Sequence, residues 1–179
     1  MRRDHELLTG EWAVLAVLCE RPAHGYAVAG ALAPDGEIGR VWSLNQALTY
    51  RALDVLKERG LIVVRGEKPG EGGPRRIELE PTSQGRELVE RWLATPENHI
   101  RDLRSVLLLK LTFRERSGLA LAPLLEAQRE VVAPKAAALQ SRARDGDVAD
   151  LWRATIARAA LDFIEQALSR PSPAARQRP

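Results

Sequence analysis

The sequence is poor in the residues that build disulfides, metal sites and aromatic pockets. It contains one cysteine, Cys19, among 179 residues, so an internal disulfide is excluded. Its three histidines, His5, His24 and His99, are isolated and have no thiols or carboxylates clustered with them, so we expect no metal site. Aromatic residues make up 4% of the chain, which leaves little from which to build an enzyme pocket.

Long apolar runs are also missing. No apolar stretch approaches the ~20 residues that a helix needs to cross a membrane. Asp4, Glu6 and Glu11 interrupt the N-terminal region, so we expect no signal peptide. With 45% hydrophobic and 28% charged residues, the composition predicts a folded, soluble protein with a sizeable core. Together with the single cysteine, these features predict a cytoplasmic protein.

Motifs of catalysis and cofactor binding are absent as well. The glycine-rich segment GEGG, residues 70–73, has neither the lysine and Ser/Thr of a phosphate-binding loop nor its strand and helix flanks. No Ser-His-acid or Cys-His set has local support in the sequence. We therefore expect a protein that is not an enzyme and has no cofactor.

The segment from Ser43 to Arg59, SLNQALTYRALDVLKER, predicts an amphipathic helix. Ser43 is the expected N-cap, and Gly60 provides a left-handed residue after the last turn. At ~100° per residue the helix has one apolar face. That face includes Leu44, Leu48, Leu53 and Leu56.

The polar face of this helix begins with three hydrogen-bond donors, Gln46, Tyr50 and Arg51, and the small Ala47. A helix in the major groove of DNA needs such residues at its N-terminal end, where they reach the base edges. Asn45 could contact DNA only if the helix tips. An ordinary surface helix would show the same amphipathic pattern, so this segment alone leaves both interpretations open.

Two extended runs follow, LIVVRG and IELEPT, and the loop EKPGEGGPRR between them predicts a β-hairpin. Lys68, Arg75 and Arg76 of this loop would lie beside a phosphate backbone. Residues 40–76 contain eight basic and four acidic residues, whereas residues 1–39 contain three basic and six acidic residues. The positive charge is thus concentrated on the helix and hairpin, although a solvated face of mixed charge is the alternative.

Two short helices are predicted before this region. The first follows Thr9 and buries an apolar face. The second, HGYAVAGAL, should use Tyr26 and Leu32 as core anchors, with His24 making a hydrogen bond within the fold at its start. Trp42 is expected to pack on the core ahead of the third helix, although its indole N–H could instead touch DNA.

This order of elements is that of a winged helix-turn-helix, and from Leu8 to about Leu93 the chain resembles the PadR-type winged-helix transcriptional regulators. The residues that carry the resemblance are Leu15 and Leu18, His24-Gly25-Tyr26, Tyr50-Arg51-Ala52-Leu53, Leu56, Arg59-Gly60-Leu61-Ile62, Gly73-Pro74-Arg75-Arg76, and Thr82 with Gly85. The chain departs from the family at Arg76-Ile77-Glu78-Leu79 and Pro81-Thr82, where the family usually has Arg-Lys-x-Tyr and then Leu-Thr.

The second half is predicted to be helical throughout, in segments 101–116, 122–144 and 148–168. Pro134 should kink or split the second segment. The apolar side of the third contains Val148, Leu151, Trp152, Ile156, Ala159, Phe163 and Ala167. These helices have more apolar surface than three helices can hide, which predicts pairing across a two-fold axis.

We therefore predict a mainly α fold with a small β-hairpin wing. Residues 1–95 would form a winged helix-turn-helix DNA-binding domain, residues 96–169 a helical dimerisation domain, and residues 170–179 a disordered tail. The expected function is sequence-specific regulation of transcription by a homodimeric repressor on double-stranded DNA with an inverted repeat. The resemblance also implies a small aromatic or hydrophobic effector, for which Trp92 and Trp152 are the candidates. The alternative is a winged-helix module that binds protein without sequence-specific DNA binding.

Overall fold

The computed structural model describes residues 7–70 and 73–170, without the side chains of residues 67–70 and 73–76. The chain divides into two compact units, Met1–Trp92 and Leu93–Pro179, which we call the winged unit and the helical unit. Of the predicted tail, residues 170–179, all but Arg170 lies outside the described residues. In the described part of the chain, no helix has the length and hydrophobicity needed to cross a membrane.

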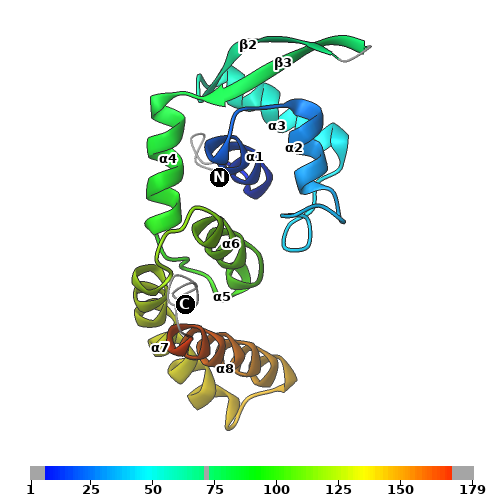
Figure 1. Cartoon of the computed structure of the whole chain (residues 1–179). Helices are drawn as coiled ribbons and strands as arrows, with labels where there is room; N and C mark the ends of the chain where they lie inside the picture. The colour runs from blue at the N-terminus through cyan, green and yellow to red at the C-terminus, as the bar shows by residue number, and fades with distance from the viewer. Residues whose placement is uncertain (1–6, 71–72, 171–179) are drawn as a thin grey trace. The chain divides into compact units, whose positions relative to one another are not determined.

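The winged unit is built from short helices and one antiparallel sheet. Its elements are α1 (Thr9–Glu20), β1 (Ala23–His24), α2 (Gly25–Leu32), α3 (Gln46–Glu58), β2 (Ile62–Gly70), β3 (Gly73–Pro81) and α4 (Ser83–Ala94). The strand order is β1-β3-β2, and the β2–β3 hairpin lies next to α3 at the top of Figure 1. The predicted hairpin is thereby confirmed, whereas the two-residue strand β1 was not predicted.

The base of the hairpin is anchored in the core and the rest stands clear of it. Leu79 of β3 is buried and pairs with Ala23 of β1. By contrast, Val63, Val64 and Ile77 are exposed, and a β-bulge interrupts the ladder just after Val64. Residues farther along the hairpin therefore belong to a projecting wing.

Two residues that were expected in the core are exposed. Tyr26 is 71% exposed and Leu48 is 47% exposed. Tyr26 is two positions before the buried Val28, which places it on the opposite side of α2. Leu48 lies at the edge of the α3 stripe, because the residues that α3 buries are Thr49, Ala52, Leu53 and Leu56. The expectation of a core role was therefore wrong for both.

Helix α3 begins later than predicted but ends as expected. Asn45, not Ser43, is the N-cap, and its Oδ1 accepts a hydrogen bond from Leu48 N at 2.8 Å. The preceding residues stay extended because Leu44 N donates to Leu32 O at 2.8 Å. At the other end Gly60 has a φ of +66°, and two backbone hydrogen bonds there, Gly60 N to Lys57 O and Leu61 N to Leu56 O (each 2.9 Å), form a Schellman motif.

The start of α4 is fastened to the end of α3. Thr82 Oγ1 accepts from Gly85 N at 3.1 Å and lies 3.0 Å from Gly60 O, to which it donates. A Cβ on Gly85 would be 2.2 Å from Leu61 O, so the two segments approach as closely as their backbones allow. The return of the wing and the first turn of α4 are thus held in one place.

The helical unit contains α5 (Ile100–Asp102), the π-helical turn η1 (Leu103–Leu107), α6 (Leu108–Arg116), α7 (Ala122–Ala143) and α8 (Val148–Ser169). Helices α7 and α8 lie side by side (Figure 1). Pro134 does not split α7, which is one continuous helix. The core of this unit consists of Leu103, Leu107, Leu111, Leu124, Leu125, Val132 and Ile164.

A polar cluster inside the helical unit fixes the segment that follows α4. Gln128 is fully buried; its Nε2 donates to Glu97 O at 2.8 Å, and its Oε1 accepts from Glu97 N at 2.7 Å. The buried ammonium of Lys110 donates to the Glu97 carboxylate and to Thr95 O. Burial lowers the pKa of Lys110, and the Glu97 carboxylate opposes that shift. We call these residues, Thr95, Glu97, Lys110 and Gln128, the clasp.

Candidate nucleic-acid interface

The polar face of α3 is exposed where the sequence predicts DNA contacts. Gln46, Ala47 and Arg51 are exposed, and Tyr50 is 42% exposed. The opposite side of the helix is held in the core, and the buried Thr49 donates from Oγ1 to Asn45 O at 3.1 Å. The first turn is therefore fixed while its outer face remains open to a ligand.

Asn45 has a structural role that the sequence did not assign to it. Its Oδ1 caps α3, so the side chain is already oriented toward the helix. The two amide hydrogens are not used in that hydrogen bond, and the residue is exposed next to Gln46. Asn45 can thus cap the helix and still present donors at its N-terminal end.

Arg51 is available for an anionic ligand. Its neighbour Asp54 pairs with Lys57, with 3.7 Å between Oδ1 and Nζ. Among the described residues Arg51 has no ion-pair partner, and its side chain is exposed. A guanidinium in this setting can bind a guanine edge or a phosphate in bidentate fashion.

The wing cations can be placed only by their backbone. Lys68 of β2 faces Arg76 of β3 in the hairpin register, and Arg75 precedes Arg76 on the same strand. The side chains of these three residues lie outside the described part of the structure. Nearer the core, Arg65 pairs with Glu80 at 3.8 Å, which fixes the charge at the base of the wing.

The environment of Trp42 favours packing over DNA contact. Its Nε1 is buried and has no hydrogen-bond partner among the described residues. A buried indole nitrogen cannot reach a phosphate at the surface. The prediction that Trp42 packs on the core ahead of α3 is therefore the better of the two.

The two tryptophans predicted to bind an effector have different environments. Trp92 is 8% exposed and stacks on Trp12, with ring centroids 5.1 Å apart and an interplanar angle of 4°. Its ring is thus occupied by an intramolecular contact within the winged unit. Trp152 is 65% exposed on α8. Of the two, only Trp152 has a free ring surface.

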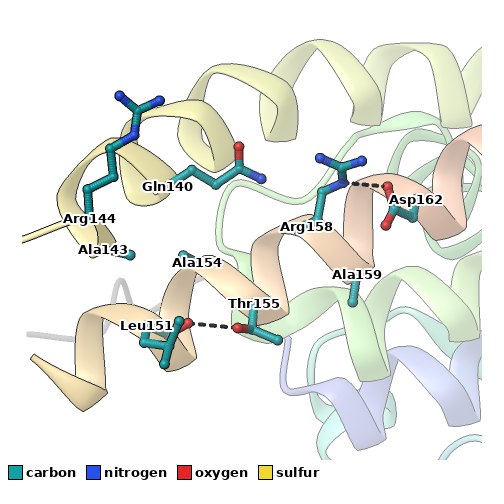
Figure 2. A pocket seen from close by; sticks show the side chains of 9 residues that line it. All are labelled: Gln140, Ala143, Arg144, Leu151, Ala154, Thr155, Arg158, Ala159 and Asp162. Carbon is teal, nitrogen blue, oxygen red and sulfur yellow. Dashed lines mark hydrogen bonds and ion pairs between the residues drawn. The ribbon is translucent and has the colours of Figure 1, made fainter. Parts of the chain in front are cut away.

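An open groove runs between α7 and α8 in the helical unit (Figure 2). It has a volume of about 480 Å³, and Ala143, Leu151, Ala154 and Ala159 form its apolar part. Arg144 and Arg158 lie along it, and Arg158 Nε donates to Asp162 Oδ1 at 2.7 Å. Neither of the predicted tryptophans lines this groove, which the sequence did not reveal.

Metal binding and cysteine nucleophilicity have little support in the part of the chain that the structure describes. No group of three or more His, Cys, Asp or Glu residues could hold a metal ion there. Burial raises the pKa of the Cys19 thiol to about 11, so this cysteine is a poor nucleophile. His24 Nδ1 accepts from Ala27 N at 3.0 Å, which confirms the predicted hydrogen bond at the start of α2.

Two helices, a third helix with an exposed N-terminal face and an antiparallel hairpin directly after it define a winged helix-turn-helix protein. Residues 14–91 match the family described as "Transcriptional regulator PadR-like family". Over these residues the winged unit is therefore similar to the PadR-like transcriptional regulators. The predicted fold class is confirmed, and the match bears out the predicted resemblance to this family within the winged unit.

Several solved structures are similar to the chain at low sequence identity. Bacillus subtilis PadR in complex with operator DNA is 19% identical, with a TM-score of 0.49 over 92% of this chain and 94% of that one. The structure of the same protein in complex with p-coumaric acid is 19% identical, with a TM-score of 0.45 over 90% of this chain and 94% of that one. Streptococcus mutans smu.1604c is 15% identical, with a TM-score of 0.44 over 91% of this chain and 100% of that one. No curated protein matches the chain.

Proposed function

We propose that the chain is a homodimeric, sequence-specific repressor of transcription that binds an inverted repeat in double-stranded DNA. In this proposal residues 1–95 read the DNA and residues 96–169 form the dimer. Gln46, Tyr50 and Arg51 contact bases or phosphates in the major groove, with Asn45 at the edge of the contact. Lys68, Arg75 and Arg76 of the wing contact the backbone and set orientation and affinity rather than sequence.

The observation that carries the proposal is the exposed N-terminal face of α3. Its donors point away from the core, while Thr49, Ala52, Leu53 and Leu56 hold the other side. The first residues of a recognition helix are the ones that reach base edges, and Ala47 leaves room for the approach. The same segment lies inside the region that matches a family of transcriptional regulators.

An unpartnered apolar stripe on α8 supports the homodimer. The residues that α8 buries are Ala154, Ala157 and Ile164. Val148, Trp152, Ile156 and Phe163 are exposed, and at ~100° per residue they lie on the side opposite the buried one. A stripe of large apolar residues that faces solvent is typical of a surface that pairs with another chain.

The order of residues along the stripe fits a second copy of the same helix. An antiparallel pair of α8 helices, with the two-fold axis at Ala159 and Ala160, sets Ile156 of one copy against Phe163 of the other. The same register sets Trp152 against Ala167, so each large residue meets a smaller one. Arg158 of one copy then lies near Asp162 of the other, with opposite charges across the axis.

A small aromatic or hydrophobic effector is a further part of the proposal, and Trp152 is its better supported contact. Its ring is exposed, and its neighbour Leu151 lines the groove between α7 and α8. A ligand there would release DNA only if it favoured one arrangement of the dimer over another. The stacked Trp92 would have to leave Trp12 before it could take part.

The test is fluorescence anisotropy of the purified protein on labelled duplexes from its own upstream region, titrated across salt. We expect saturable binding, preference for one sequence over scrambled DNA, and an affinity that falls as salt rises. Flat anisotropy on every duplex at low salt would exclude the proposal.

Substitution of Arg51 separates DNA binding from protein binding. Arg51→Ala should weaken specific binding by about 10- to 100-fold, because a bidentate contact to a base is worth roughly 1–3 kcal/mol. Lys57→Ala is the matched control. It removes a cation from the same helix, but this cation already forms an ion pair with Asp54. An Arg51→Ala/Arg76→Ala double variant should lose DNA binding, whereas a protein contact on another face would survive. DNA binding that is unchanged in both variants would rule out α3 and the wing as the surface that contacts DNA.

A further inference from the structure

The chain contains two tyrosines, Tyr26 and Tyr50, and the structure brings the helices that carry them together. A Cβ on Gly25 would lie 2.9 Å from Tyr50 Cε1 and 3.2 Å from Leu53 Cδ1. The start of α2 therefore rests on the ring of Tyr50, and glycine is the residue that permits this approach. Tyr26 follows Gly25 directly, so an exposed phenol stands on α2 where that helix meets α3.

The exposure of Tyr26 has no explanation in the packing of the winged unit. Helix α2 is otherwise built from small and apolar residues, and it buries Val28, Ala29 and Leu32. A tyrosine usually hides most of its ring and keeps only its hydroxyl near water. Tyr26 is exposed over most of its surface, and its hydroxyl has no hydrogen-bond partner among the described residues.

His24 adds a second donor beside Tyr26. Its Nδ1 accepts from Ala27 N at 3.0 Å, and an accepting ring nitrogen carries no proton. Neutral His24 therefore carries its proton on Nε2, which makes Nε2 a hydrogen-bond donor; this tautomer follows from the hydrogen-bond pattern. The ring centroids of His24 and Tyr26 are 6.4 Å apart, so the two rings that carry these donors are neighbours.

We propose that the Tyr26 hydroxyl and His24 Nε2–H form an uncharged contact to the DNA phosphate backbone beside the groove-reading face of α3. This inference rests on the proposed DNA binding and assigns α2 a part in it. Phosphate oxygens accept hydrogen bonds and do not donate them, and neutral side chains make many of the known contacts to them. In helix-turn-helix proteins the helix before the recognition helix crosses the backbone, which is where α2 stands relative to α3.

An uncharged contact has a signature that distinguishes it from the arginine and lysine contacts. Neutralising a phosphate with a cation releases counterions, and this release produces the slope of log K against log salt. A neutral donor binds the phosphate without that release. Loss of Tyr26 or His24 should therefore lower the affinity at every salt concentration and leave the slope unchanged.

The variants are Tyr26→Phe, which removes one hydroxyl, and His24→Asn, which keeps a side-chain acceptor for the Ala27 N–H but removes the donor. We expect each to bind the protein's own operator about 3- to 10-fold more weakly, as for a hydrogen bond to a charged group. The double variant should lose about 10- to 100-fold by the same reasoning. Arg76→Ala, which removes a proposed backbone contact of the wing, should reduce the salt slope by about 1 when measured in parallel.

Ser169→Ala is the matched control, because it removes an exposed hydroxyl from the end of α8, and it should bind as the unsubstituted protein does. Thermal unfolding followed by circular dichroism should give the same midpoint for Tyr26→Phe and the parent, since the removed hydroxyl bonds to no described residue. Unchanged affinity in Tyr26→Phe and His24→Asn, or a reduced salt slope in either, would overturn the inference. Failure of the unsubstituted protein to bind any duplex would overturn the proposed function itself, and with it this contact; an exposed Tyr26 would then indicate a protein partner.

Discussion

At the scale of single residues, the winged unit depends on one very close approach of two backbone segments. Gly85 lies where the end of α3, the return of the wing and the first turn of α4 converge, and a Cβ there would be 2.2 Å from Leu61 O. No flexible side chain can yield to relieve such a clash, so the backbone itself would have to move. Thr82, which bonds to both segments, would move with it.

We therefore predict that Gly85→Ala lowers the free energy of unfolding by about 1–3 kcal/mol, the usual cost of overpacking a close-packed site. Gly30→Ala is the control: nothing lies within 4 Å of a Cβ at Gly30, which is inside α2. That change should stabilise by roughly 0.5–1 kcal/mol, because alanine is the better helix former. Urea unfolding of both variants measures the difference, and equal stabilities would contradict the account.

A second prediction at this scale concerns Cys19. Burial raises the pKa of its thiol to about 11, so at pH 8 very little of it is the reactive thiolate. Iodoacetamide labelling, followed by mass spectrometry, should be much slower in the folded protein than in denaturant at that pH. The protein should also lose stability as pH rises from about 9 toward 11, because the folded state resists losing the proton. Cys19→Ala should lack this loss, and rapid labelling of the folded protein at pH 8 would contradict the prediction.

Single residues also mark the limit of prediction from sequence. The cap at His24 and the left-handed Gly60 follow from local rules, and both are confirmed. Tyr26 was assigned to the core because it is a large residue in an apolar segment. Tyr26 is exposed because α2 packs through Val28, Ala29 and Leu32, and tertiary contacts that no local pattern contains decide which face of so short a helix is buried.

At the scale of elements, the clasp is the feature most dependent on residues distant in sequence. Gln128 bonds to the backbone of a residue 31 positions earlier, and Lys110 reaches back 13 positions to Glu97. Sequence periodicity places Gln128 within an apolar stripe but does not say what satisfies its amide. The structure answers that question, since both halves of the amide pair with the backbone of one residue, Glu97.

Removal of the buried cation should be costly. We predict that Lys110→Met lowers the free energy of unfolding by about 3–5 kcal/mol, because the Glu97 carboxylate would remain largely buried without its partner. The double variant Lys110→Met/Glu97→Gln should recover part of that loss. Lys57→Met, which breaks an exposed pair with Asp54, should change stability by less than about 1 kcal/mol. Urea unfolding compares the three, and equal losses in the two single variants would show that the clasp contributes no more than a surface pair.

Element boundaries were less predictable than element types. The three long helical segments of the second half and the hairpin of the first were anticipated from periodicity. The start of α3 was misplaced by two residues because Leu44 is held by the end of α2, a constraint from outside the segment. The π-helical turn at Leu103–Leu107 had no signal in the sequence pattern.

At the scale of the whole molecule, the proposed function depends on two copies acting together. Two winged units on one dimer would read half-sites about 34–36 Å apart, one turn of the duplex. A single copy would bind one half-site and lose most of its affinity. Oligomeric state and operator affinity should therefore change together when the α8 stripe is altered.

Ala159→Glu tests this link. The two-fold axis proposed for α8 passes beside Ala159, so the change would set two carboxylates against each other in an apolar contact. We expect a monomer by light scattering and operator affinity reduced by at least about tenfold, in line with the loss of one half-site. Ala137→Glu, the same change at an exposed position of α7, should leave both properties unchanged. A dimer of normal mass in Ala159→Glu would place the interface elsewhere.

The stacked pair of Trp12 and Trp92 has a practical consequence for optical spectroscopy. Two parallel indoles at this distance couple their electronic transitions, which gives a circular dichroism signal in the absorption band of tryptophan that separated rings lack. The signal exists only while α1 and α4 keep their packing, so it reports on the winged unit alone. The fluorescence of Trp152, in contrast, is that of an indole exposed to water until a partner covers α8. One protein without any attached dye thus carries separate reporters for the folding of one unit and the assembly of the other.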